Sequence, residues 1–185
     1  MSDLVLFALG GAVVFAGFLL AFRLTGFKSQ TPADYSDGPV LDIQEHLNGP
    51  LICEGVLYGP TGRVVSRFVA DMHGTWDGNK GHLTEDFRYD SGTVQKREWF
   101  LTAKDGGAFD AKAPDVVGTG RGVQLGSAIN LKYRIMLAET AGGHTLDVTD
   151  WMYLLDNGTI VNRSQMRKFG IKVAELVATI RKADV

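Results

Sequence analysis

The stretch His82–Leu101, HLTEDFRYDSGTVQKREWFL, indicates the fold more directly than any other part of the chain. In its first half, Leu83, Phe87 and Tyr89 share one face of an alternating pattern. A period of two is typical of a β-strand with one buried face. The turn signal Asp90-Ser91-Gly92 ends this run, and a second run of strand-forming residues follows it. The stretch therefore predicts two antiparallel strands joined by a tight turn.

Short runs of this kind, separated by glycine-containing turns, continue through most of the chain. They are rich in Val, Leu, Phe, Tyr, Trp and Thr, several of which favour strands. Regular short strands with tight turns are typical of an antiparallel barrel or sandwich. The sequence predicts eight or nine strands, approximately at residues 50–58, 63–73, 81–90, 93–104, 108–113, 115–125, 128–138, 144–155 and 158–166.

A helical pattern is expected in this part of the chain only near the C-terminus. Val173, Leu176, Val177 and Ile180 line one side of a helix, and charged residues occupy the other side. This spacing predicts an amphipathic α-helix that packs on the barrel. A less common alternative is that the basic end of this helix lies on a membrane surface. Residues 48–185 are thus expected to form one mainly β domain with a C-terminal helix.

The first residues of the chain are strongly apolar. The nineteen residues from Leu4 to Phe22 carry no charged or polar side chain, and a helix of this length would be about 28 Å long. That length is close to the thickness of the hydrocarbon core of a bilayer, so residues 1–24 are expected to form one transmembrane helix. A cleaved secretory signal is the alternative, but Asp3 stands where such a signal carries a basic residue.

Three alanines recur every fourth residue within the apolar stretch. Small residues at this spacing allow a second transmembrane helix to approach closely, so Ala8, Ala12 and Ala16 form a predicted packing face. Alternatively, these alanines only reflect the usual composition of such helices. The polar residues 25–47 are expected to be a linker, with a short turn of helix near Leu41–Leu47.

Composition and charge exclude several functions. The chain has 19 Lys and Arg residues against 21 Asp and Glu, a net charge of −2, so it is not expected to bind nucleic acid by neutralising phosphates. The single cysteine, Cys53, excludes an internal disulfide and a cysteine-based zinc site. The four histidines show no metal-ligand spacing, and no nucleophile motif is recognised. We therefore expect no enzyme activity, no cofactor and no bound metal.

The segment Gly118–Gly122, GTGRG, superficially resembles a phosphate-binding loop. It lacks the Lys-Ser/Thr pair of a P-loop, and no helix is expected after it. Glycine at alternate strand positions instead indicates a bulge or a close approach of two strands.

Polar residues on otherwise apolar strand faces are the best indication of a binding site, because burying them is costly unless they are paired or solvated. Glu85 shares its face with Leu83 and Phe87, and Arg97 and Asp150 lie on similar faces. A barrel interior with an arginine and carboxylates could orient the polar head of an apolar ligand. Alternatively, these residues form a structural ion pair, or the inward and outward faces are assigned wrongly by one residue. The predicted cavity residues are Glu85, Arg97, Trp99, Tyr133, Asp150 and Trp151.

Several motifs together carry a resemblance to a known family: Gly74-Thr75-Trp76-Asp77-Gly78, Arg97-x-Trp99, Gly118-x-Gly120-x-Gly122 and Asp150-Trp151-Met152-Tyr153. They resemble DUF3833, a bacterial family of unknown function whose members are described as lipoproteins. The resemblance implies a lipocalin-like antiparallel barrel in the cell envelope, with no established catalytic residues. Typical members carry a cysteine for lipid attachment at the end of their signal. This chain has no cysteine there, so a transmembrane anchor would replace the lipid.

The expected location combines the resemblance with the apolar stretch. A single-pass protein of the bacterial inner membrane is expected. Arg23 and Lys28 favour a cytoplasmic domain, because basic residues flanking a span tend to stay inside. The resemblance implies the periplasmic side, which we favour because a large exported domain can override two flanking charges.

Two functions follow from these observations. The first is a membrane-anchored, lipocalin-like protein that binds or hands on a hydrophobic ligand, such as a lipid, quinone or pigment, at the bacterial membrane surface. The alternative is an accessory subunit of a larger membrane complex, docked through its transmembrane helix and holding no ligand. The expected partners are the lipid bilayer, a hydrophobic small molecule and other transmembrane helices.

Overall fold

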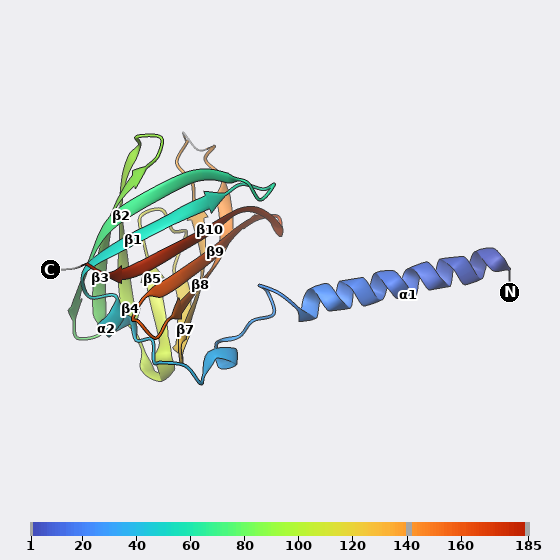
Figure 1. The fold of residues 1–185 in the computed structure, drawn as a ribbon, viewed down its shortest axis with the longest axis horizontal. Coiled ribbons are helices and arrows are strands. Elements are labelled where there is room, and N and C mark those ends of the chain that lie inside the picture. Colours follow the sequence, from blue (N-terminus) through green and yellow to red (C-terminus); the bar gives the residue numbers. More distant parts are fainter. Residues whose placement is uncertain (1, 140–141, 184–185) are drawn as a thin grey trace.

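A closed antiparallel barrel dominates the structure, a computed structural model that describes residues 2–139 and 142–183 (Figure 1). Each strand pairs with the next along the chain, and β1 pairs with β10 to close the ring. Closure leaves no unpaired strand edge. The strands of the described residues are β1 Gly49–Tyr58, β2 Val64–Asp77, β3 Lys80–Tyr89, β4 Val94–Ala103, β5 Ala108–Lys112, β6 Gly120–Leu125, β7 Ala128–Met136, β8 Thr145–Leu154, β9 Ile160–Lys168 and β10 Ile171–Lys182.

The strand predictions are confirmed in outline, and the hairpin from His82 to Leu101 forms as expected. In it, β3 and β4 pair so that Leu83 faces Trp99 and Glu85 faces Arg97. Each predicted run contains one strand, but the predicted number of eight or nine is wrong. The described part of the chain has ten strands, and the additional one lies where a helix was expected.

The predicted C-terminal α-helix is wrong, because these residues form β10. Leu176 and Ile180 are four residues apart, a spacing that fits both one turn of a helix and two periods of a strand. In the barrel, both side chains line the interior. The register shifts between Lys172 and Ala174, so the alternation of the strand is interrupted there. Val177, between these two inward residues, is also apolar, so the sequence of this strand shows no clear alternation.

The predicted transmembrane anchor is also contradicted. Within the residues that the structure describes, no helix is long and apolar enough to cross a membrane. The apolar stretch on which the prediction rests lies in α1 (Asp3–Leu24). The expected single-pass location in the inner membrane, and with it the periplasmic placement, is therefore wrong. The bilayer and transmembrane helices as partners are unsupported.

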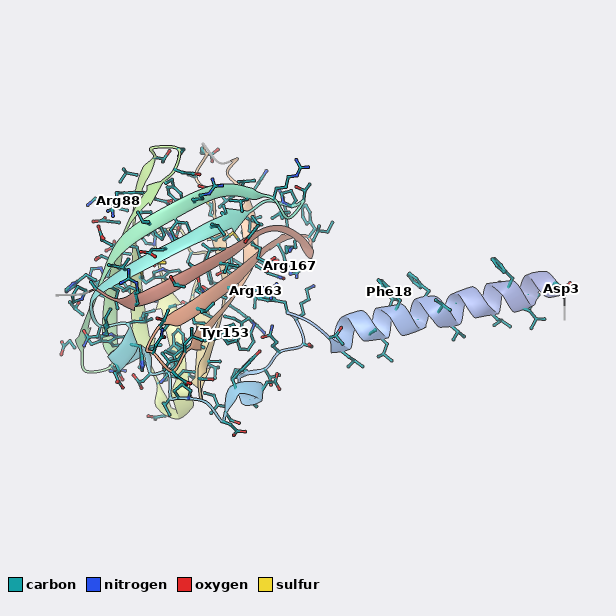
Figure 2. The ribbon with its side chains drawn as sticks, in the orientation of Figure 1. Asp3, Phe18, Arg88, Tyr153, Arg163 and Arg167 are labelled. Atoms are coloured by element: carbon teal, nitrogen blue, oxygen red, sulfur yellow. The ribbon has the colours of Figure 1, made fainter. Side chains whose placement is uncertain are left out.

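The helix α1 extends away from the barrel (Figures 1 and 2). Its described side chains, including Phe18, surround the helix and are exposed. Ala8, Ala12 and Ala16 are among the exposed residues. Their role as a packing face for another helix stays a prediction.

Part of the segment 25–47 packs against the barrel. The short 3-10 helix η1 (Pro32–Tyr35) lies beside the outer surface, where Tyr35 contacts Trp151 and Tyr153 with ring centroids 5.8 and 5.0 Å apart. The short turn of helix expected near Leu41–Leu47 is confirmed as α2 (Ile43–His46).

The helix α2 covers one end of the barrel. Leu41 and Ile43 are each only 1% exposed and belong to the main apolar core. The indole N–H of Trp76 donates to the carbonyl oxygen of Leu47 at 3.0 Å, and the ammonium group of Lys182 donates to the carbonyl oxygen of Glu45 at 3.0 Å. The apolar residues and these two bonds hold α2 on the strand ends.

The N-cap of α2 allows a test of how much this helix contributes to the stability of the chain. The carboxylate of Asp42 accepts from the backbone N–H of Gln44 at 2.7 Å and of Glu45 at 3.2 Å. Asp42→Ala is expected to lower the free energy of unfolding by about 1 kcal/mol, because these N–H groups lose their acceptor. Urea unfolding monitored by circular dichroism measures the change. Asp42→Asn is the matched control, since asparagine caps a helix equally well. Equal losses in the two variants would contradict the capping role.

The glycine-rich segment shows the close approach that its pattern indicates. Gly122 on β6 lies opposite Phe109 on β5. A Cβ atom at Gly122 would lie 2.0 Å from Cζ of Phe109. Only a residue without a side chain allows the ring to lie flat across the neighbouring strand.

Candidate binding cavity

A cavity of about 950 Å³ occupies the interior of the barrel. Ile43 and Leu47, from the α2 region, line it at the covered end. At the opposite end the lining reaches the β5–β6 loop at Asp115 and the β7–β8 loop at Leu137 and Glu139. The cavity therefore runs through the barrel from the α2 end to the loops.

Alternate residues of each strand point inward and form the wall of the cavity. Most of these inward residues are apolar. Trp99 on β4 and Tyr133 on β7 meet edge to face, with ring centroids 5.2 Å apart. The guanidinium of Arg97 lies 4.9 Å from the centre of the Trp99 ring. The large apolar and aromatic lining residues are Leu57, Phe68, Met72, Leu83, Phe87, Tyr89, Trp99, Leu101, Phe109, Leu131, Tyr133, Ile135, Met152, Met166, Leu176 and Ile180.

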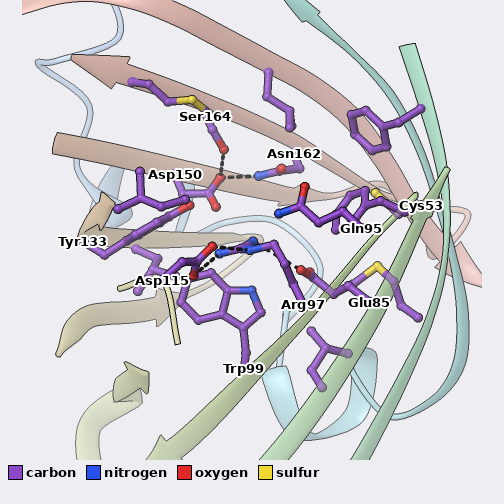
Figure 3. A pocket seen from close by; sticks show the side chains of 18 of the residues that line it. Cys53, Glu85, Gln95, Arg97, Trp99, Asp115, Tyr133, Asp150, Asn162 and Ser164 are labelled. Carbon is purple, nitrogen blue, oxygen red and sulfur yellow. Dashed lines mark hydrogen bonds and ion pairs between the residues drawn. The ribbon is translucent and has the colours of Figure 1, made fainter. Parts of the chain in front are cut away.

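An ion network centred on Arg97 lies inside this apolar wall (Figure 3). Arg97 donates to both carboxylate oxygens of Asp115, from Nε at 2.7 Å and from Nη2 at 2.9 Å. Its Nη1 donates to Oε2 of Glu85 at 3.3 Å. The two-bond pair is the stronger one, because its geometry matches both planar groups. Asp115 is thus the main partner of Arg97, and Glu85 is the secondary partner.

Burial sets the protonation of this network. Desolvation raises the pKa of Glu85 to about 7, and the opposing effect of Arg97 is too small to cancel it. The charges of Asp115 and Asp150 raise this pKa further. Desolvation acts to lower the pKa of Arg97 itself, but the hydrogen bonds to Asp115 and the charge of Glu85 outweigh it and raise that pKa. Arg97 is therefore charged throughout the physiological range, whereas Glu85 titrates near neutral pH.

A second polar group lies across the cavity on β8 and β9. Oδ1 of Asp150 accepts from the amide of Asn162 and from the hydroxyl of Ser164. Asp150 faces Ser164 in the strand pairing, so the register of β8 and β9 brings these groups together. Desolvation raises the pKa of Asp150, and the two hydrogen bonds only partly counteract it.

Two further titratable groups in the wall are uncharged near neutral pH. Desolvation raises the pKa of the Tyr133 hydroxyl, and the charge of Asp150 adds to this effect. Desolvation also raises the pKa of the Cys53 thiol to about 12. A protonated thiol is a poor nucleophile.

Five of the six predicted cavity residues line the cavity: Glu85, Arg97, Trp99, Tyr133 and Asp150. Trp151 does not line it, because it follows the inward-pointing Asp150 and points to the outer surface, where Tyr35 covers it. The side chain of Trp151 is 2% exposed for this reason.

Sequence reasoning missed Asp115, Asn162 and Ser164. Asp115 lies in the loop between β5 and β6, where no alternation indicates a direction. Asn162 and Ser164 lie on β9, where the next residue after each of them, Arg163 and Gln165, is also polar. A strand that is polar on both faces gives no signal of which face points inward.

No group of three or more His, Cys, Asp or Glu residues within 2–139 and 142–183 is arranged to hold a metal ion. The polar groups of the cavity are suited to hydrogen bonding and charge pairing.

Two solved structures share the fold of the chain. The S-type phycobiliprotein lyase CPES from Guillardia theta has a TM-score of 0.57 at 9% sequence identity, over 84% of this chain and 99% of that one. The protein Rv2717c from M. tuberculosis has a TM-score of 0.55 at 20% identity, over 76% of this chain and 94% of that one. At these identities the similarity shows the barrel fold alone.

A search of curated proteins finds no match to this sequence. The family model for a "Protein of unknown function (DUF3833)" matches residues 21–182, which include every strand of the barrel. The motifs around Trp76, Arg97, Gly120 and Asp150 all lie within the matched range. The chain therefore belongs to the DUF3833 family.

Proposed function

We propose that the barrel binds an apolar small molecule in its central cavity and that it acts as a binding protein, without catalysing a reaction. The observation that carries this proposal is the hollow interior of about 950 Å³ with its mainly apolar wall. Ligand sites in proteins typically have volumes of about 300–1,000 Å³ and combine apolar walls with a few polar groups. The cavity meets both criteria.

The strand number supports a hollow interior. Side chains are just able to fill a barrel of about eight strands, and the diameter grows with the number of strands. The barrel here has ten strands among the described residues. Its lining side chains therefore leave space at the centre, and water in contact with so much apolar surface would be displaced favourably by an apolar ligand.

The polar groups would orient the ligand. Arg97 on β4 and Asp150 on β8 both point into the cavity (Figure 3) and are held by hydrogen bonds to their neighbours. A lipid, a quinone and a pigment all combine an apolar body with a polar group, so all three classes fit this arrangement. The similarity to a phycobiliprotein lyase, at 9% identity, concerns the barrel alone and assigns no lyase reaction to this chain.

Contact quenching of tryptophan fluorescence tests the proposal. Of the three tryptophans, Trp99 lines the cavity, whereas Trp76 packs beside α2 and Trp151 lies on the outer surface. Titration with 12-bromododecanol, a neutral apolar probe whose bromine quenches on contact, is expected to reduce the emission in a saturable way. The protonated Cys53 thiol is not expected to react with the bromide.

Two variants localise the binding. Trp99→Phe is expected to abolish most of the quenching, because the tryptophan in contact with the probe is gone. Trp151→Phe is the matched control and is expected to retain it. The absence of saturable quenching in the unchanged chain, or equal quenching in both variants, would overturn the proposal.

A further inference from the structure

The charged groups that line the cavity are unequal in number. Among the residues that the structure describes, four carboxylic acids, Glu85, Asp115, Glu139 and Asp150, line it together with one basic residue, Arg97. Glu139 is exposed in the β7–β8 loop, and the other four groups lie deeper in the wall. Charges in a poorly solvated interior interact more strongly than in water. The acids outnumber the base, so the wall offers more acceptor oxygens to a donor or cationic ligand group than donors to an anionic one.

The single base is not available as a partner for an anion. Arg97 already makes two hydrogen bonds to Asp115 and one to Glu85, and its side chain is only 16% exposed. A ligand carboxylate that approached Arg97 would also approach these two acids. Its repulsion from them would offset the attraction of a guanidinium that is already paired.

Asp150, in contrast, has an acceptor oxygen that is free to bond a donor of the ligand. The two donors from Asn162 and Ser164 both bond to Oδ1. Among the described residues no hydrogen bond to Oδ2 is formed, and the carboxyl group lines the cavity (Figure 3). The charge of Arg97 acts to lower the pKa of Asp150, but no ion pair joins the two side chains in that part of the chain. A carboxylate held in this way presents one oxygen to a donor from the cavity.

We propose that the polar group of the ligand is a hydrogen-bond donor, a protonated amine or another N–H group, received by Oδ2 of Asp150. This inference rests on the proposed function and specifies the class of ligand. The apolar body of the ligand then extends along the aromatic wall that includes Trp99 and Tyr133. The ion network of Arg97, Glu85 and Asp115 ties β3, β4 and the β5–β6 loop together and does not bind the head group.

Two competitors with the same apolar chain and opposite charges test this inference. The full chain is loaded with 12-bromododecanol at pH 7, and dodecylamine or dodecanoate is added to displace it, with recovery of Trp99 emission as the readout. The protonated amine is expected to compete at least about tenfold more strongly than the carboxylate, as charge-assisted hydrogen bonds are stronger than neutral ones. Asp150→Asn is expected to remove most of this preference, while binding of the neutral reporter persists.

Asp147→Asn is the matched control, because Asp147 lies on the same strand and is exposed on the outer surface. It is expected to leave the preference unchanged. Equal competition by the two competitors, or a preference that survives Asp150→Asn, would overturn the inference and leave the proposed function intact. Failure of the reporter to bind would overturn both. If Asp150→Asn does not fold, the comparison of the two competitors on the unchanged chain still decides the question.

Discussion

Arg97→Leu is expected to lower the free energy of unfolding by about 3–5 kcal/mol at neutral pH, the range found when one partner of a buried ion pair is removed. The reason is that Arg97 pairs with both Glu85 and Asp115 inside the barrel. Without the guanidinium, the buried carboxyl group of Glu85 and the partly buried one of Asp115 have no cation beside them. Leucine fills only part of the space, and the contact of the guanidinium with Trp99 is lost as well.

Urea unfolding at several pH values measures this effect. The loss is expected to decrease at pH 5, because protonation of Glu85 removes one of the two unpaired charges. Arg88→Leu is the control, since Arg88 forms an exposed pair with Asp71 on the outer surface. Its effect is expected to be far smaller, because water screens exposed pairs. An equal loss in both variants, or a loss that is independent of pH, would contradict the role assigned to Arg97.

Glu85→Gln is expected to change how stability depends on pH. The pKa of Glu85 is about 7 in the folded chain, compared with 4.5 for an ordinary glutamate. Between these pH values the folded state holds a proton that the unfolded state has lost, so raising the pH favours unfolding. The contribution of this proton is complete below about pH 4.5 and is lost once the pH passes about 7. It corresponds to about 3 kcal/mol.

The glutamine variant has no such proton. As the pH rises from about 4.5 to 7, the unchanged chain loses the stability that this proton contributes, and the variant does not. The free energy of unfolding of the variant is therefore expected to rise relative to that of the unchanged chain over this range. Asp150 is present in both proteins, so its contribution cancels in the difference. Glu54→Gln is the control, because the side chain of Glu54 on β1 is exposed. Curves that stay parallel from pH 4 to 8 would show that Glu85 does not titrate in this range.

These experiments address a cavity that was only partly foreseeable. The alternation in residues 82–101 correctly placed Glu85, Arg97 and Trp99 on the inward face. It works there because inward and outward residues differ clearly in polarity. Trp151 was also named as a cavity residue, although it points outward. Alternation cannot place both Asp150 and its neighbour Trp151 on the inward face.

Errors near the two chain ends have a different origin. In β10, the pair Leu176 and Ile180 fits a helix and a strand equally, and the decision is made by pairing with β1 and β9. In α1, hydropathy predicted a spanning helix, which the described residues do not support. The prediction for β10 judged the segment by its own spacing, without the strands that it pairs with in the folded chain.

The sequence by itself determined the antiparallel β architecture, the order of most strands along the chain and the inward-facing residues of the strands that alternate clearly. These properties depend on neighbouring residues, since alternation and turns act over a few positions. The tertiary structure decided that the ring closes with ten strands, that its centre is hollow, and that Arg97 pairs with Asp115 from a distant loop. Those properties depend on closure and on contacts between segments far apart in the chain, which no local pattern records.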